Sequence, residues 1–145
     1  KHDVKIIFEP GRSIIANCAV LFTQIIYIKN TEKKRFIILD AAMNDLMRPA
    51  LYGSHHNIIP LIKNNKKNKK IHDFVGPVCE TTDKFLSIKG FQHLKEKEYV
   101  AISDVGAYGM SLSSNYNLRP KASEIMIKNK SSKIILKRQK LLNII

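Results

Sequence analysis

The sequence contains no tryptophan, two cysteines and 12 acidic residues in 145 positions, and it lacks any long apolar run. Its longest uncharged stretch, residues 13–28, is 16 residues long and includes the polar side chains of Asn17, Thr23 and Gln24. A membrane-spanning helix needs about 20 consecutive, mostly apolar residues. We therefore predict no transmembrane segment. Residues 1–3 lead directly into a strand-like pattern, so no signal peptide is predicted either.

The cysteines and histidines are too sparse to indicate a metal site. Cys18 and Cys79 form no CxxC pair, and the adjacent His55 and His56 lack a third ligand at a suitable spacing. Cys18 lies in an apolar run, which predicts a small buried side chain. Two unpaired thiols are typical of a protein of the reducing cytoplasm.

Arginine is scarce although the net charge is +13. Of the 25 basic residues 20 are lysine and five are arginine, and isoleucine alone accounts for 21 residues. The lysine-rich run at residues 63–70 has no aromatic side chain on which a nucleic-acid base could stack, so it is interpreted as a solvated loop. A basic β-barrel that binds nucleic acid is kept as an alternative, but the missing motifs argue against it.

Short runs of branched and aromatic residues, separated by charged, glycine- or asparagine-containing linkers, predict a mainly β protein with a barrel or sandwich architecture. A turn of helix is expected within residues 12–20, and apolar spacing indicates a helix over residues 44–52 that is interrupted by Pro49. Residues 1–20 have the pattern of the end of one domain, and residues 21–145 that of a β domain. The predicted strands cover residues 4–8, 21–28, 35–39, 74–79, 99–103, 124–127 and 133–137.

The sequence EPGR at positions 9–12 follows the first predicted strand. Gly11 would let the backbone approach an anion closely, and Arg12 offers a planar fork of donors for phosphate or carboxylate. Glu9 could pair with a protonated ring nitrogen. Taken alone, four residues after a strand are a weak signal and favour a structural turn over a binding site.

Three further segments carry candidate functional groups. Arg48 and Tyr52 stand four residues apart, so one turn of helix would place both on one face as a carboxylate site; a surface arginine beside a half-buried tyrosine is the alternative. In the sequence GPVCE at positions 76–80, a thiol beside the carboxylate of Glu80 can deliver a proton to carbon. The alternative there is a buried structural Cys79. Small residues around Tyr108 would let its phenol approach a ligand.

In this order, the EPGR, DAAMNDLMRPALY (positions 40–52), GPVCE and DVGAYG (positions 104–109) motifs resemble the C-terminal part of pyridoxal-phosphate-dependent amino-acid decarboxylases. This family includes the ornithine, arginine and diaminopimelate decarboxylases. The resemblance implies that residues 1–20 form the last strand and turn of an α/β (TIM-like) barrel. Residues 21–145 would then form the C-terminal β-barrel or sandwich domain.

The resemblance also implies roles for the candidate residues. Glu9 would hold the pyridinium nitrogen of pyridoxal 5'-phosphate. Gly11, Arg12 and Tyr108 would contact its phosphate, with Arg12 and Tyr108 also near the substrate. Arg48 and Tyr52 would contact the distal end of the substrate. Cys79 would be the proton donor, reaching the active site from the partner subunit of a homodimer.

The residue after this cysteine favours one substrate class within the family. Ornithine decarboxylases have aspartate there, and their substrate ends in a single amine. Glu80 for a distal ammonium, with Arg48 and Arg12 for a distal carboxylate, matches diaminopimelate, whose far end is a whole amino acid. The expected reaction is decarboxylation of meso-diaminopimelate to L-lysine and carbon dioxide.

Two other functions stay open at this point: an ornithine, arginine or polyamine-precursor decarboxylase of the same family, and a homologue that binds pyridoxal phosphate without catalysis. No lysine lies in a context resembling the Schiff-base motif. The 145-residue chain alone is therefore expected to be a fragment without turnover.

Overall fold

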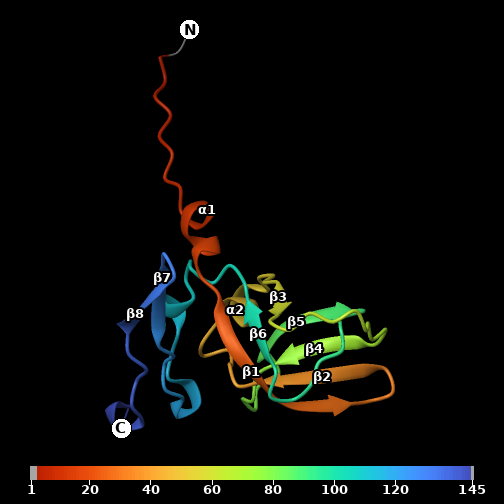
Figure 1. Ribbon diagram of the computed structural model, residues 1–145. Helices are drawn as coiled ribbons and strands as arrows, with labels where there is room; N and C mark the ends of the chain where they lie inside the picture. The colour runs from red at the N-terminus through yellow and green to blue at the C-terminus, as the bar shows by residue number, and fades with distance from the viewer. Residues whose placement is uncertain (1–2, 145) are drawn as a thin grey trace.

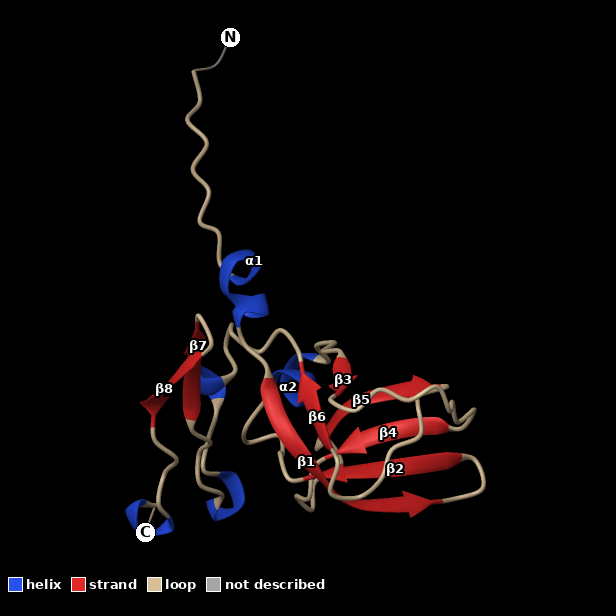
Figure 2. Ribbon diagram, in the orientation of Figure 1, coloured by secondary structure: helices blue, strands red, loops and turns tan. Residues whose placement is uncertain are grey.

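The computed structural model describes residues 3–144 and shows one curled six-stranded sheet beside a separate two-stranded hairpin (Figures 1 and 2). The strands are β1 (Leu21–Asn30), β2 (Lys34–Leu39), β3 (Ile58–Pro60), β4 (Ile71–Val75), β5 (Lys84–Lys89), β6 (Tyr99–Ile102), β7 (Glu124–Lys128) and β8 (Ser131–Leu136). Short helices connect them: α1 (Arg12–Ile15), α2 (Arg48–Tyr52) and the 3-10 turns η1 (Ala16–Cys18), η2 (Met110–Leu112), η3 (Tyr116–Leu118) and η4 (Leu141–Asn143).

The six strands follow the order β3-β6-β1-β2-β4-β5, and every neighbouring pair is antiparallel except β2 with β4. The long strand β1 pairs with β6 through its first residues and with β2 through its last, with a register shift between Ile25 and Tyr27. A bulge of this kind bends a strand and increases its twist. It therefore lets one strand serve both halves of the sheet and gives the sheet its curl.

The core lies inside this curl and follows the alternation of the strands. In β2, the side chains of Arg35, Ile37 and Leu39 are buried while their neighbours are half-buried. Phe74 of β4 is fully buried and meets the ring of Phe91 edge-on, with 5.1 Å between ring centroids. Burying a side chain of this size contributes about 1.5–3 kcal/mol. The other members of the cluster are Ile25, Ala41, Leu46, Ile58, Phe85, Leu94, Val100 and Ile102.

A buried carboxylate joins β2, β4 and β5. Asp73 is 2% exposed and accepts a hydrogen bond from the Ser87 hydroxyl. The ammonium groups of Lys34 and Lys84 lie 3.0 and 3.3 Å from its two oxygens. Burial raises the pKa of Asp73, but Ser87 and the two lysines outweigh that effect and bring its pKa below the ordinary value. The charged form is therefore a structural link between the three strands.

The structure confirms the mainly β class and most of the predicted strands. The ranges 21–28, 35–39 and 124–127 lie within β1, β2 and β7, and the ranges 99–103 and 133–137 extend one residue past β6 and β8. Short β3 and β5 were not predicted, because β3 has only three residues and both ends of β5 are lysines. The division into domains at residues 20 and 21 stays a prediction. Residues 1 and 2 of the first predicted domain lie outside the described residues.

Three element predictions are wrong. The expected buried strand at residues 4–8 is an exposed extended segment, with Phe8 84% exposed, because no strand of the described chain pairs with it. The strand expected at 74–79 ends at Val75, and the chain bends over residues 77–79. Pro49 does not interrupt a helix over 44–52: it occupies the first turn of the five-residue α2, where its missing N–H costs nothing.

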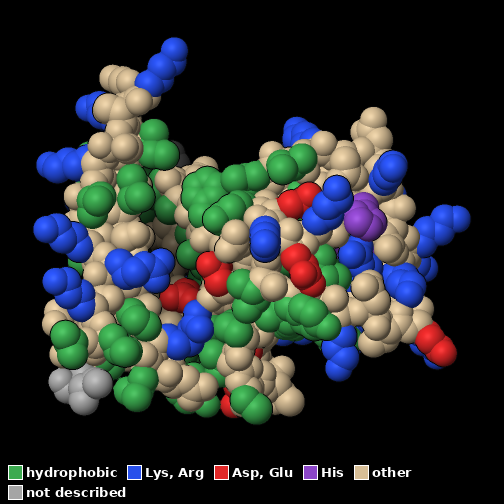
Figure 3. Space-filling model, turned by 60° about the horizontal axis from the view of Figure 1, so that its bottom comes forward, with side chains coloured by type: hydrophobic (Ala, Val, Ile, Leu, Met, Phe, Trp, Pro, Cys, Tyr) green, Lys and Arg blue, Asp and Glu red, His purple; other side chains and the backbone are tan. Residues whose placement is uncertain are grey.

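Cys18 is exposed, which corrects the prediction of a buried side chain. It lies in η1, outside the curl of the sheet, so the apolar run around it does not enter the core. Across residues 3–144, no helix is long and apolar enough to cross a membrane, and no three His, Cys, Asp or Glu side chains are grouped as metal ligands. In the view of Figure 3, lysine and arginine side chains are scattered between hydrophobic ones.

Candidate active site

A hollow of about 660 Å³ brings together four of the predicted site residues. They come from three separate parts of the chain: α1, α2 and the segment after β6. The residues that line the hollow are Arg12, Arg48, Tyr52, Ser54, Tyr108 and Leu112.

Helix α2 sets the position of Arg48 and Tyr52. Gly53 ends the helix in the left-handed region, with φ of 61°, and its N–H bonds to the Pro49 carbonyl at 3.0 Å. The Arg48 guanidinium lies 5.3 Å from the centre of the Tyr52 ring and donates to the Ser54 hydroxyl at 3.2 Å. The prediction that Arg48 and Tyr52 share a face is thereby confirmed.

Tyr108, on the segment after β6, approaches the same guanidinium. The centre of its ring lies 5.4 Å from the guanidinium carbon of Arg48. Its φ is 62°, a left-handed conformation that few residues other than glycine adopt. Gly106 makes this turn possible: its N–H bonds to the Ala16 carbonyl at 2.9 Å, and a Cβ there would lie 2.1 Å from the Ile15 carbonyl oxygen. The glycine therefore packs the turn against the chain that follows Arg12, which places Arg12 and Tyr108 in one hollow.

The lining is basic and rich in hydrogen-bond donors. It presents two guanidinium groups, two phenols and one hydroxyl, and contains no Asp or Glu. Arginine matches the planar geometry of carboxylates and phosphates with paired donors. The arrangement suits a ligand with anionic groups.

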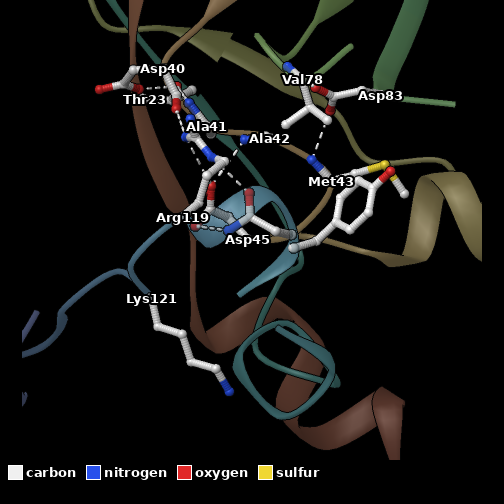
Figure 4. A network of polar contacts seen from close by, with 12 residues as sticks. Thr23, Asp40, Ala41, Ala42, Met43, Asp45, Val78, Asp83, Arg119 and Lys121 are labelled. Atoms are coloured by element: carbon white, nitrogen blue, oxygen red, sulfur yellow. Dashed lines mark hydrogen bonds and ion pairs between the residues drawn. The ribbon is translucent and has the colours of Figure 1, made fainter. Parts of the chain in front are cut away.

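A network of polar contacts holds the turn at residues 40–45, which leads into α2 (Figure 4). The Arg119 guanidinium donates to Asn44 Oδ1 at 2.9 Å and to the Asp40 carbonyl, and it lies 3.8 Å from Asp45 Oδ2. The Ser114 N–H bonds to the Asn44 carbonyl at 2.9 Å. These contacts tie the stretch that follows Tyr108 to the stretch that precedes Arg48. Burial raises the pKa of Asp45, against the opposing effects of the Ala42 N–H and Arg119.

Cys79 and Glu80 lie in a different place, the loop at residues 76–83 between β4 and β5. The Cys79 thiol is exposed and free, so the alternative of a buried structural cysteine is wrong. The Glu80 carboxylate accepts hydrogen bonds from the Thr82 N–H at 3.4 Å and the Thr81 hydroxyl at 3.1 Å. These two residues lower the pKa of Glu80, the Thr82 N–H most strongly. Neither Cys79 nor Glu80 lines the hollow.

The structure thus groups Arg12, Arg48, Tyr52 and Tyr108 and leaves the other predicted site residues apart. Glu9 and Gly11 are exposed on the extended segment before α1 and do not line the hollow.

The sequence analysis did not identify Arg119 as a residue that organises the site. The scarcity of arginine in a lysine-rich chain was a signal that pointed to it. In a chain that fills its surface with lysine, four of five arginines have defined partners or line the hollow: Arg12, Arg35, Arg48 and Arg119.

Comparison with known proteins gives a consistent result. Residues 13–106 match the family model described as "Pyridoxal-dependent decarboxylase, C-terminal sheet domain". Two similar curated proteins are the diaminopimelate decarboxylases of Aquifex aeolicus and Vibrio cholerae. The first is 45% identical over 93% of this chain and 32% of its own length. The second is 46% identical over 97% of this chain and 33% of its own length.

Among solved structures, diaminopimelate decarboxylase from Helicobacter pylori complexed with L-lysine superposes with a TM-score of 0.85. It is 42% identical, and the match covers 94% of this chain and 33% of that one. The chain therefore spans about a third of the length of the curated relatives that it matches.

Proposed function

We propose that this chain, which belongs to the pyridoxal-dependent decarboxylase family and matches its C-terminal sheet domain, forms part of the active site of a diaminopimelate decarboxylase. The observation that carries the proposal is the convergence of Arg12, Arg48, Tyr52 and Tyr108 in one hollow without an acidic side chain. The enzyme would convert meso-diaminopimelate to L-lysine and carbon dioxide. An α/β barrel domain that binds the cofactor would pack against this chain.

The donor set of the hollow fits the cofactor, pyridoxal 5'-phosphate. Arg12 and Tyr108, which line it together, would hold the phosphate, with Gly11 next to Arg12 in sequence. Glu9, on the segment before α1, would pair with the ring nitrogen. When bound, the cofactor supplies an electron sink for the loss of the carboxylate. The residues of this chain would bind and orient the cofactor and the substrate, and would protonate the reacting carbon.

The distal end of diaminopimelate is an amino acid with both charges, and it determines the proposed specificity. Arg48 would pair with the distal carboxylate, with Tyr52 beside it and Arg12 and Tyr108 also within the hollow. Glu80 would accept the distal ammonium, and its lowered pKa keeps it ionised. At the reacting end, the α-carboxylate would leave as carbon dioxide, and Cys79 would give its thiol proton to the α-carbon in its place.

A homodimer would complete the site, because Cys79 and Glu80 do not line the hollow of their own chain. The exposed thiol and its neighbouring carboxylate are free to enter the hollow of a second copy. The two free cysteines are compatible with the reducing cytoplasm as the compartment.

A substrate panel tests this function on the enzyme that contains this chain. We expect kcat/KM for meso-diaminopimelate to exceed that for ornithine or arginine by at least about 100-fold, because substrates without a distal amino acid leave charged site groups unpaired. Carbon dioxide release measures all three rates. Faster turnover of ornithine would contradict the role of Glu80, and no release from any substrate would indicate a binding protein without catalysis.

A further inference from the structure

We propose that Asp83 is a positioning residue. It holds the loop at residues 76–83, which carries Cys79 and Glu80, in the conformation that proton transfer requires. The inference rests on the proposed function of Cys79 as proton donor, and it assigns to Asp83 no contact with the substrate. It follows from how this buried carboxylate joins the loop to the 40–45 turn, where the other contact is a weak one from the exposed Thr82 hydroxyl to the Met43 sulfur at 3.8 Å.

The Asp83 carboxylate is buried, 3% exposed, and each oxygen accepts a different backbone N–H. Oδ1 accepts the N–H of Met43 at 2.7 Å, and Oδ2 accepts the N–H of Val78 at 2.9 Å. Figure 4 shows the carboxylate between these two segments. One side chain therefore connects the residue directly before Cys79 to the 40–45 turn.

The backbone of the loop closes around the same residue. The Gly76 N–H bonds to the Asp83 carbonyl at 3.0 Å, and the Asp83 N–H bonds to the Glu80 carbonyl at 3.1 Å. A Cβ at Gly76 would lie 2.2 Å from Asp83 Oδ2, so the carboxylate occupies the space that a larger residue would fill. The absence of a side chain at Gly76 therefore leaves the space that the Asp83 carboxylate occupies.

The functional side chains have no comparable anchors. Within residues 3–144, the Glu80 carboxylate accepts hydrogen bonds from the adjacent Thr81 and Thr82, and the Cys79 thiol is exposed and free. The position of the thiol is therefore set by its backbone. Asp83 is the buried group that holds this backbone to the rest of the protein.

Met43 connects the loop to the frame of the hollow. It belongs to the 40–45 turn, which is bonded to Arg119 and Ser114 and continues into α2 with Arg48. The loop and the hollow are therefore held in a fixed relative position within each chain. Positional errors of about 1 Å in a reacting group can lower the rate by about 100-fold.

A carboxylate is needed at this position because it offers two acceptor oxygens to two donors. Asparagine has the same shape but one acceptor, so its NH₂ group would face a backbone N–H. Burial raises the pKa of Asp83, against the hydrogen bonds from Val78 and Met43, which favour the ionised form.

The test compares Asp83→Asn with Asp73→Asn in the complete enzyme. Asp73 is an equally buried carboxylate, but its partners Lys34, Lys84 and Ser87 belong to β2 and β5 and not to the loop. We expect Asp83→Asn to lower kcat at least about 10-fold, and Asp73→Asn to change kcat less than about twofold while lowering the melting temperature. Equal losses of kcat in both variants would overturn the proposal.

A double-mutant cycle separates positioning from general stability. If Asp83 acts through Cys79, Asp83→Asn causes no further loss of kcat in a Cys79→Ala background. Losses that multiply would contradict the proposal. Gly76→Ala is the second variant: it displaces the carboxylate without removing it, and we expect a loss of kcat in the same direction.

Amide hydrogen exchange tests the geometry without using activity. We expect Asp83→Asn to accelerate exchange at Val78 or Met43, and unchanged exchange at both would overturn the proposal. If wild-type enzyme released no carbon dioxide from diaminopimelate, or if Cys79→Ala were fully active, the proposed function would fail instead. A wild-type enzyme that needs Cys79 but tolerates Asp83→Asn would refute the role of Asp83 alone.

Discussion

Cys79→Ala is expected to lower kcat for diaminopimelate decarboxylation by about 100- to 10,000-fold, the range that a positioned proton donor contributes. The thiol is exposed and free, next to a carboxylate, and it lies on a loop that projects from the sheet between β4 and β5. The substitution removes the proton donor but leaves every side chain that lines the basic hollow in place. KM is therefore expected to change only a few-fold. Steady-state release of carbon dioxide, with lysine as the second product, measures both constants.

Cys18→Ala is the matched control for this prediction. It removes the other free, exposed thiol of the chain, which lies in η1 and does not line the hollow. We expect its kcat to stay within about twofold of wild type, the range of substitutions away from the site. A Cys79→Ala enzyme that keeps wild-type kcat would exclude the thiol as the proton donor. Equal losses in both variants would show that thiols matter only for structure.

Arg48→Met is expected to raise KM for meso-diaminopimelate by about 100-fold, because it removes a charged partner of the distal carboxylate. Methionine keeps an unbranched side chain of similar length but removes the guanidinium, which lies 5.3 and 5.4 Å from the ring centres of Tyr52 and Tyr108. The variant therefore tests the charge and not the bulk. The measurement is kcat and KM on meso-diaminopimelate and on ornithine.

Ornithine is the matched substrate for this variant, since it has no distal carboxylate. We expect Arg48→Met to change its kinetics much less, so that the preference for diaminopimelate collapses. Arg138→Met, which removes an exposed arginine outside the hollow, should leave both substrates unaffected. A variant that loses activity equally on both substrates would show that Arg48 serves the cofactor or the fold.

Local patterns were sufficient to predict several of the elements whose partners lie in this chain, but not β3 or β5. The branched residues of β1 and β2 indicated strands, and the spacing of Arg48 and Tyr52 placed both on one face of α2. The segment at residues 4–8 has an equally apolar pattern, yet it is extended and exposed. A β-strand needs neighbouring strands to pair with, and an apolar sequence pattern does not show whether such strands are present in the chain.

The contacts that hold the site together could not be predicted, because they join residues far apart in the chain. Asp83 accepts the N–H of Met43 across 40 positions, and Arg119 donates to Asn44 across 75. Tyr108 reaches Arg48 only because Gly106 packs against the backbone after α1. Such contacts follow from the path of the whole chain and leave no periodic signal in the sequence.

Mixing two variants, assayed at a diaminopimelate concentration near the wild-type KM where each alone is almost inactive, tests most directly whether the hollow of one chain works with the Cys79 loop of another. Cys79→Ala subunits keep an intact hollow, and Arg48→Met subunits keep an intact loop. Random pairing in a symmetric dimer would give one intact site in each mixed dimer, and activity would recover to about a quarter of wild type. Each variant taken alone through the same subunit exchange should stay almost inactive at this substrate concentration. Recovery of no activity, in mixtures that are shown to contain mixed dimers, would contradict the shared site.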